Sequence, residues 1–92
     1  MPKRSDSNQK EIVAALRKVG VIVTDLHGVG KGCPDILCSW GGSWTPLEIK
    51  NGKGKLTPDE VAWHEKQKAV CPVVNSVEDA IEAVMPNVRR RN

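Results

Sequence analysis

The sequence predicts a small α/β protein in which one mixed β-sheet packs against helices, with elements in the order αβββαβα. Short segments rich in β-branched residues alternate with segments of helical periodicity, and a Gly-Gly dipeptide separates two apolar runs. A chain of 92 residues is large enough for one core and too small for two. We therefore expect a single domain over residues 1–92, with its core at about 8–85 and a basic tail at 86–92.

Apolar periodicity and capping signals place the expected helices. Residues 8–19 carry an apolar stripe at helical spacing, and Gly20 follows as a stop signal. Residues 57–70 open with Thr-Pro-Asp-Glu, which combines a threonine cap with a proline in the first turn. A third helix is expected over 76–85, between a serine cap and a proline.

The expected strands are residues 21–26, 34–40, 43–50 and 72–75. Gly41-Gly42 favours a two-residue hairpin turn, because both of its positions need positive φ. In that register Trp40 pairs with Ser43, and counting back pairs Asp35 with Glu48. A loop of odd length would instead place Asp35 on the opposite face of the sheet.

Basic residues outnumber acidic ones by 14 to 11, which gives a net charge of +3. Their placement in termini and loops is typical either of a solubilising surface or of a protein with a polyanionic partner. The N-terminus is too polar for a signal peptide, and no apolar run approaches the roughly 20 residues that span a bilayer. We expect a cytoplasmic protein without a membrane partner. The candidate nucleic-acid-binding residues are Lys31, Lys53, Lys55, Arg89, Arg90 and Arg91.

Three charged residues stand within the most apolar stretch of the chain. Glu48 and Lys50 are two apart on a strand, so they share a face and lie about 6.6–6.8 Å apart along it. The two-residue turn brings Asp35 beside Glu48. Adjacent carboxylates repel each other, and a hard divalent cation such as Mg²⁺ relieves that repulsion. A cross-strand salt bridge of Lys50 with both acids is the structural alternative.

The residues around these charges resemble a known family. GKGCPD at 30–35, followed by EIK at 48–50, is similar to the PD-(D/E)xK nucleases and, more narrowly, to the small stand-alone VRR-NUC proteins, many of them phage-encoded. The likeness covers residues 8 to about 80, and the related archaeal Holliday-junction resolvases have a similar core. It implies a restriction-endonuclease-like αβββαβ core and a metal-dependent phosphodiesterase that leaves a 5′-phosphate.

The resemblance also implies roles for individual residues. Asp35 and Glu48 would bind Mg²⁺ or Mn²⁺ together with the carbonyl of Ile49, and Lys50 would serve the attacking water. Apart from the resemblance, the glycine-rich segment 28–32 can be interpreted as a flexible loop that places Lys31 near a DNA phosphate, or as a plain glycine turn.

Two further acidic residues each allow two interpretations. Glu11 matches a glutamate that relatives carry on the first helix, which implies a metal-binding role, but it is also spaced to form a capping pair with Asn8. Glu60 stands where relatives usually have glutamine. A glutamate cannot donate a hydrogen bond to a phosphate, so Glu60 is either a catalytic residue or only the acid of a capping box.

These observations predict a Mg²⁺- or Mn²⁺-dependent endodeoxyribonuclease that needs no small-molecule cofactor. By resemblance it would act as a homodimer on branched DNA such as Holliday junctions, in the host cytoplasm if it is phage-encoded. One alternative is a non-catalytic nucleic-acid-binding module that retains the fold. Another is a structural sheet protein with a salt-bridged hairpin.

Overall fold

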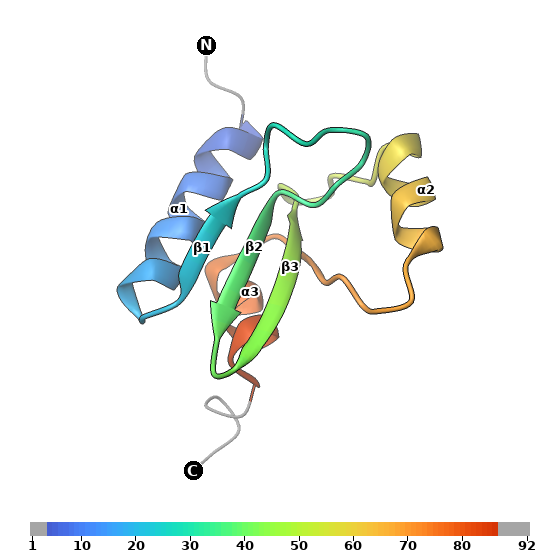
Figure 1. Cartoon of the computed structure of the whole chain (residues 1–92). Helices are drawn as coiled ribbons and strands as arrows, with labels where there is room; N and C mark the ends of the chain where they lie inside the picture. Colours follow the sequence, from blue (N-terminus) through green and yellow to red (C-terminus); the bar gives the residue numbers. More distant parts are fainter. Residues whose placement is uncertain (1–3, 87–92) are drawn as a thin grey trace.

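The computed structural model describes residues 4–86, with side chains from residue 8 onward. Within this range it confirms the predicted order of helices and strands and the α/β class (Figure 1). The elements are α1 (Arg4–Lys18), β1 (Ile22–Asp25), β2 (Ile36–Trp40), β3 (Ser43–Ile49), α2 (Pro58–Lys66), β4 (Val73–Val74) and α3 (Val77–Val84).

The strands form a four-stranded mixed sheet in the order β1-β2-β3-β4. The first three strands are antiparallel to their neighbours, whereas β4 joins β3 in parallel. A parallel neighbour needs a crossover connection, and the segment that contains α2 supplies it. Figure 1 shows α2 standing away from the sheet, whereas α1 and α3 lie close to it.

The hydrophobic core lies between one face of the sheet and the helices α1 and α3. Alternate residues of the strands point into it, as expected for a sheet with one covered face. On the other face Ile22 and Trp44 are 67% and 68% exposed. The core consists of Ile12, Leu16, Val21, Val23, Ile36, Cys38, Leu47, Ile49, Val74, Ala80, Val84 and Met85.

The β2–β3 hairpin has the predicted register. Trp40 pairs with Ser43 across a two-residue turn, and both turn glycines have positive φ, +61° and +82°. The ladder ends at the pair Ile36–Leu47, one residue before the expected pairing of Asp35 with Glu48. Asp35 therefore precedes β2 rather than belonging to it.

Two helix boundaries differ from the expectation. Helix α1 begins at Arg4 rather than at residue 8, so Asn8 lies inside the helix and is not its cap. The side-chain amide of Asn8 donates instead to the carbonyls of Lys50 at 2.8 Å and Asn75 at 3.4 Å. Helix α2 ends at Lys66 instead of residue 70. None of its described residues is buried, and a helix without a buried face lacks the packing that would extend it.

The helices of the structure can be compared with the length needed to cross a membrane. Among residues 4–86, no helix has both the length and the apolar character needed to span a bilayer. Arg89, Arg90 and Arg91, predicted to bind nucleic acid, lie outside the described residues.

Candidate active site

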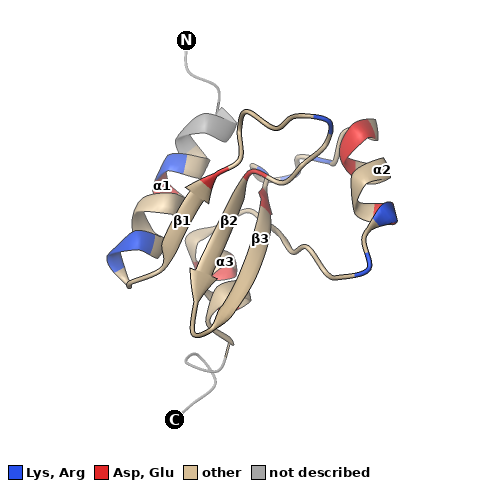
Figure 2. Cartoon of the chain, viewed as in Figure 1, with Lys and Arg blue, Asp and Glu red and all other residues tan. Residues whose placement is uncertain are grey.

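The charged residues singled out in the sequence gather at one edge of the sheet. Because β1, β2 and β3 are antiparallel, the end of β1, the start of β2 and the end of β3 meet there. Figure 2 shows acidic segments at this edge, beside the loop that leads toward α2. The residues form a charged cluster, which consists of Asp35, Glu48, Lys50 and Glu60.

Glu48 is the buried member of the charged cluster. Its side chain is 1% exposed, and its Oε1 atom has no hydrogen-bond partner. Burial, the charge of Asp35 and a hydrogen bond shared with Asp35 raise the pKa of Glu48 from 4.5 to about 9, although the ammonium of Lys50 opposes the shift. An ionised carboxylate in this position destabilises the folded protein unless a proton or a cation neutralises its charge.

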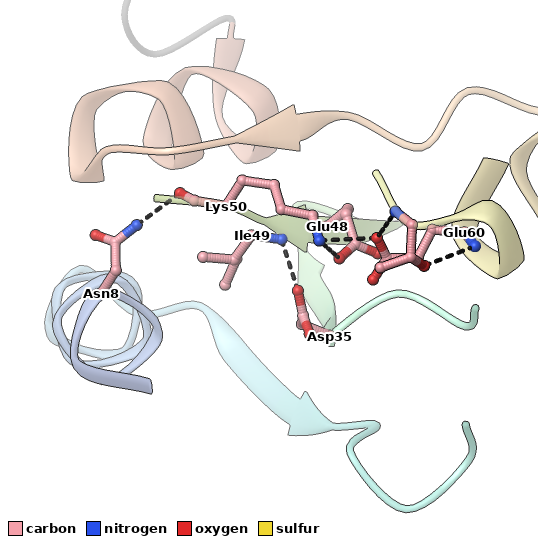
Figure 3. A network of polar contacts seen from close by, with 7 residues as sticks. Asn8, Asp35, Glu48, Ile49, Lys50 and Glu60 are labelled. Carbon is pink, nitrogen blue, oxygen red and sulfur yellow. Dashed lines mark hydrogen bonds and ion pairs between the residues drawn. The ribbon is translucent and has the colours of Figure 1, made fainter. Parts of the chain in front are cut away.

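Asp35 is fixed to β3 through both its backbone and its side chain. Its amide donates to the carbonyl of Leu47 at 3.1 Å, and its Oδ2 accepts a hydrogen bond from the amide of Ile49 at 2.7 Å (Figure 3). These bonds keep Asp35 close to β3 although the regular ladder has ended. The predicted proximity of Asp35 and Glu48 is therefore present, and the side-chain bond to Ile49 maintains it.

Lys50 lies between two carboxylates. Its Nζ is 2.7 Å from Oε1 of Glu60 and 3.8 Å from Oε2 of Glu48. Burial alone would lower the pKa of Lys50, but the hydrogen bond to Glu60 and the surrounding negative charges outweigh it and raise this pKa. The side chain is thus held as an ammonium whose closest partner is Glu60.

Glu60 is the acid of the predicted capping box and also contacts the charged cluster. Its Oε1 accepts from the amide of Thr57 at 2.8 Å, while Thr57 Oγ1 accepts from the Glu60 amide at 3.2 Å, which is the predicted capping box. The same Oε1 bonds to Lys50. Burial would raise the pKa of Glu60, but the bonds to Lys50 and Thr57 lower it. Glu60 therefore connects the start of α2 to the charged cluster.

The other predicted acidic ligand, on α1, has no polar contact with the charged cluster among the described residues. Glu11 is exposed, and within the described residues no hydrogen bond or ion pair joins it to Asp35, Glu48 or Lys50. The residue of α1 that reaches this edge is Asn8, through the carbonyl of Lys50. Asn8 lies in the helix interior, so the alternative of a capping pair with Glu11 is wrong. Sequence reasoning missed the Asn8–Lys50 contact because it joins residues 42 positions apart.

The glycine loop before β2 packs against the start of α2. Gly32 has a φ of +82°, and a Cβ there would lie 2.6 Å from the carbonyl carbon of Asp59 and 2.9 Å from the amide nitrogen of Glu60. The glycine thus permits close approach of the α2 backbone, which places Glu60 near Lys50. Lys31, next to it, is exposed, with a φ of +56°.

Two further features surround the cluster. Lys53 and Lys55 are exposed on the loop between β3 and α2. The thiols of Cys33 and Cys71, which sequence reasoning did not connect with this site, lie close enough to the cluster for its negative charges to raise their pKa. Burial, followed by the charges of Glu48 and Asp35, raises the pKa of Cys33, and burial raises the pKa of Cys71 to about 11. Both thiols are therefore protonated neighbours rather than reactive thiolates.

The donor set fits a hard cation that is shared with a substrate. Asp35 and Glu48 offer two carboxylates, and Oε1 of Glu48 is buried without a partner. Among the side chains that the structure describes, those of residues 8–86, no group of three or more histidine, cysteine, aspartate or glutamate residues is arranged to hold a metal ion. Mg²⁺ is commonly bound by one or two carboxylates, with waters and phosphate oxygens completing its shell. The residues suit that mode and not a closed protein cage.

Comparisons with protein-family models, with curated proteins and with solved structures found no match to this chain.

Proposed function

We propose that the protein is a Mg²⁺- or Mn²⁺-dependent nuclease that hydrolyses phosphodiester bonds in DNA. The single observation that carries the proposal is the placement of two carboxyl groups, Asp35 and Glu48, side by side at a sheet edge, with one of them buried and the ammonium of Lys50 beside them. A purely structural sheet has no need of this arrangement, because burying Glu48 destabilises the fold.

Each residue of the site has a distinct part in the proposed reaction. Asp35 and Glu48 hold the cation, with the carbonyl of Ile49 as the further ligand that the resemblance implies. A bound divalent cation polarises a phosphoryl oxygen and lowers the pKa of a bound water. Lys50, kept charged by Glu60 at 2.7 Å, donates hydrogen bonds to the developing negative charge. In this arrangement Lys50 acts as an electrostatic donor and not as the base that deprotonates water.

The choice of DNA as the substrate rests on charge placement near the cluster. Lys31, Lys53 and Lys55 are exposed on the two loops next to the charged cluster, so a polyanion approaching Asp35 and Glu48 meets positive charge nearby. This pattern supports binding of a nucleic-acid backbone. Selectivity for branched DNA and action as a homodimer are parts of the proposal that come from the resemblance.

The proposal is tested by incubating the protein with linear, flap, fork and four-way DNA, with Mg²⁺, with Mn²⁺ and with EDTA. Cleavage should require the metal and should disappear in Asp35→Ala. Glu65→Ala, which removes an exposed acid of α2, is the matched control and should cleave normally. Metal-independent cleavage, or full activity in Asp35→Ala, would refute the assignment.

A second candidate function is a non-catalytic nucleic-acid-binding module. The observation that favours it is the bond between Lys50 and Glu60, which is shorter than the contact of Lys50 with Glu48. A lysine engaged in this way is partly withdrawn from a substrate. This candidate predicts metal-independent DNA binding without cleavage of any substrate in the panel, so the same experiment separates the two.

A further inference from the structure

A groove that the charged cluster does not use lies between α1 and β1. Its volume is about 480 Å³, which falls within the range of small-molecule binding sites. Side chains from one stripe of α1 form one wall, and residues at the end of β1 form the other. The size suits a single nucleotide and is too small for a base pair within a duplex.

The floor of this α1–β1 groove is apolar. Val13 and Ala14 of α1 face Val23 of β1 and Ile36 of β2 across it. Val23 and Ile36 belong to the core and are held rigidly, whereas Ala14 is exposed and presents only a methyl group. The accessible apolar surface, from Val13 and Ala14, can accept the face of a sugar or a base.

The rim of the groove carries both donors and an acceptor. Lys10 is exposed, and Arg17 donates one hydrogen bond to the carbonyl of Val23 at 3.0 Å, which fixes its guanidinium at the groove. A guanidinium has five N–H donors, so others can bind an anion. Asp25, which accepts from the amide of His27 at 2.7 Å, supplies a carboxylate. A site for phosphate alone would not need this acceptor, whereas the amino group of a base can donate to it.

The groove lies next to the charged cluster along the chain. Ile36 of its floor follows Asp35, and Gln9 of its wall follows Asn8, whose amide bonds to the carbonyl of Lys50. Consecutive Cα atoms are 3.8 Å apart, so the backbone that lines the groove begins one residue from Asp35 and one residue from Asn8. A strand bound at Asp35 and Glu48 would have this groove beside its next nucleotides.

We propose that the α1–β1 groove binds one unpaired nucleotide of the DNA strand that passes through the charged cluster. Lys10 and Arg17 bind its phosphate, and its base lies on the apolar floor with Asp25 as an acceptor. This inference rests on the proposed nuclease function and narrows its substrate class to DNA with a single-stranded segment beside the scissile phosphate. A paired base cannot enter the groove without leaving its duplex.

The test measures binding in EDTA, so that it does not depend on cleavage. Fluorescence anisotropy compares a blunt DNA duplex with the same duplex carrying a five-nucleotide tail. The wild-type protein should bind the tailed DNA more tightly. Lys10→Glu should weaken that binding by about tenfold. Lys18→Glu, a change of the same charge on an exposed residue of α1 outside the groove, should weaken it much less.

A second variant fills the groove without changing charge. Ala14→Trp should abolish the preference for tailed DNA and leave binding to the blunt duplex unchanged. Ala14→Met serves the same purpose if the tryptophan prevents folding, which circular dichroism would show.

Equal affinity for tailed and blunt DNA, or equal losses in Lys10→Glu and Lys18→Glu, would overturn the groove assignment. The outcome is separable from that of the nuclease proposal. A groove-dependent preference without cleavage in Mg²⁺ refutes only the nuclease, and cleavage without this preference refutes only the groove.

Discussion

The amide of Ile49 donates a hydrogen bond to the side chain of Asp35 at 2.7 Å, at the point where regular pairing of β2 with β3 has ended. A side chain thus replaces the backbone as the acceptor for β3. The bond fixes one oxygen of Asp35 and keeps its carboxyl group close enough to Glu48 for its negative charge to raise the pKa of that acid. The folded backbone therefore holds two acids close together, which affects the stability of the protein as well as the chemistry of the site.

Replacing the buried acid with an amide should stabilise the protein. Glu48→Gln keeps the shape of the side chain and eliminates a carboxyl group whose pKa is raised to about 9. We expect the free energy of unfolding at pH 7.5 without metal to rise by about 1–3 kcal/mol, because wild-type Glu48 must take up a proton on folding at this pH and glutamine need not. Urea denaturation measures the change. Glu65→Gln, an exposed control, should leave stability within about 0.5 kcal/mol. A less stable Glu48→Gln protein would contradict this account of the site.

The same group should give the metal-free protein a characteristic pH dependence. The unfolded chain releases the Glu48 proton near pH 4.5, whereas the folded protein keeps it to about pH 9. Between these values the folded state binds more protons, so the contribution of Glu48 to stability falls as pH rises. We expect stability to decline from pH 5 to pH 8 in EDTA, and the slope to be smaller in Glu48→Gln. Identical slopes in both proteins would show that Glu48 titrates normally.

Loss of the lysine should affect catalysis more than binding. Lys50→Ala should lower the cleavage rate in Mg²⁺ by at least about 10²-fold, because the ammonium acts on charge that develops in the transition state. DNA affinity in EDTA should change by less than about threefold. Lys53→Ala, an exposed lysine three residues away, should show the opposite pattern, with weaker binding and little change in rate under saturating DNA. Full cleavage by Lys50→Ala would show that Lys50 forms salt bridges but has no part in catalysis.

Local signals in the sequence were sufficient for much of this fold. The hairpin register follows from Gly41-Gly42, since only a two-residue turn uses positive φ at both positions. The capping box at Thr57 and Glu60 also follows from residues three apart. These predictions concern neighbours along the chain, where few conformations compete.

The contacts that complete the charged cluster were not predictable in this way. Asn8 bonds to a carbonyl 42 residues away, and in sequence it resembles a helix cap. Glu60 reaches Lys50 because α2 packs on the loop at Gly32, a contact between backbones that leaves no apolar pattern. Glu11, by contrast, matched a family position but remains exposed. Long-range polar contacts depend on how elements are placed in space, and sequence spacing does not encode that placement.

Assembly remains a prediction from chain length and resemblance. A domain of 92 residues offers a small DNA footprint, on the order of 600–1,000 Å² for a single module. A four-way junction presents two equivalent strands related by a two-fold axis, which a C₂ homodimer would match. We expect a dimeric mass by light scattering at micromolar concentration and paired, symmetric nicks on an immobile junction in Mg²⁺. A monomeric mass together with unpaired nicks would exclude this mode of action.

The position of α2 should depend on the absence of a side chain at Gly32. Gly32→Ala places a Cβ within 3 Å of the Asp59 and Glu60 backbone and also adopts a positive φ, which costs an L-residue about 1–2 kcal/mol. Gly30→Ala is a matched control, since its φ is +73° but no atom lies within 4 Å of the added Cβ.

Both variants should be destabilised because alanine must adopt a positive φ, and only Gly32→Ala should displace α2 from the loop that contains Gly32. Because Lys50 is bonded to Glu60 of that helix, cleavage should fall in Gly32→Ala and persist in Gly30→Ala. Hydrogen exchange reports the displacement directly. The amide of Val61, which donates to the carbonyl of Thr57 at 2.9 Å in the first turn of α2, should exchange faster in Gly32→Ala while the amides of β2 and β3 remain protected. Equal exchange at Val61 in the two variants would mean that α2 is held in place by other contacts.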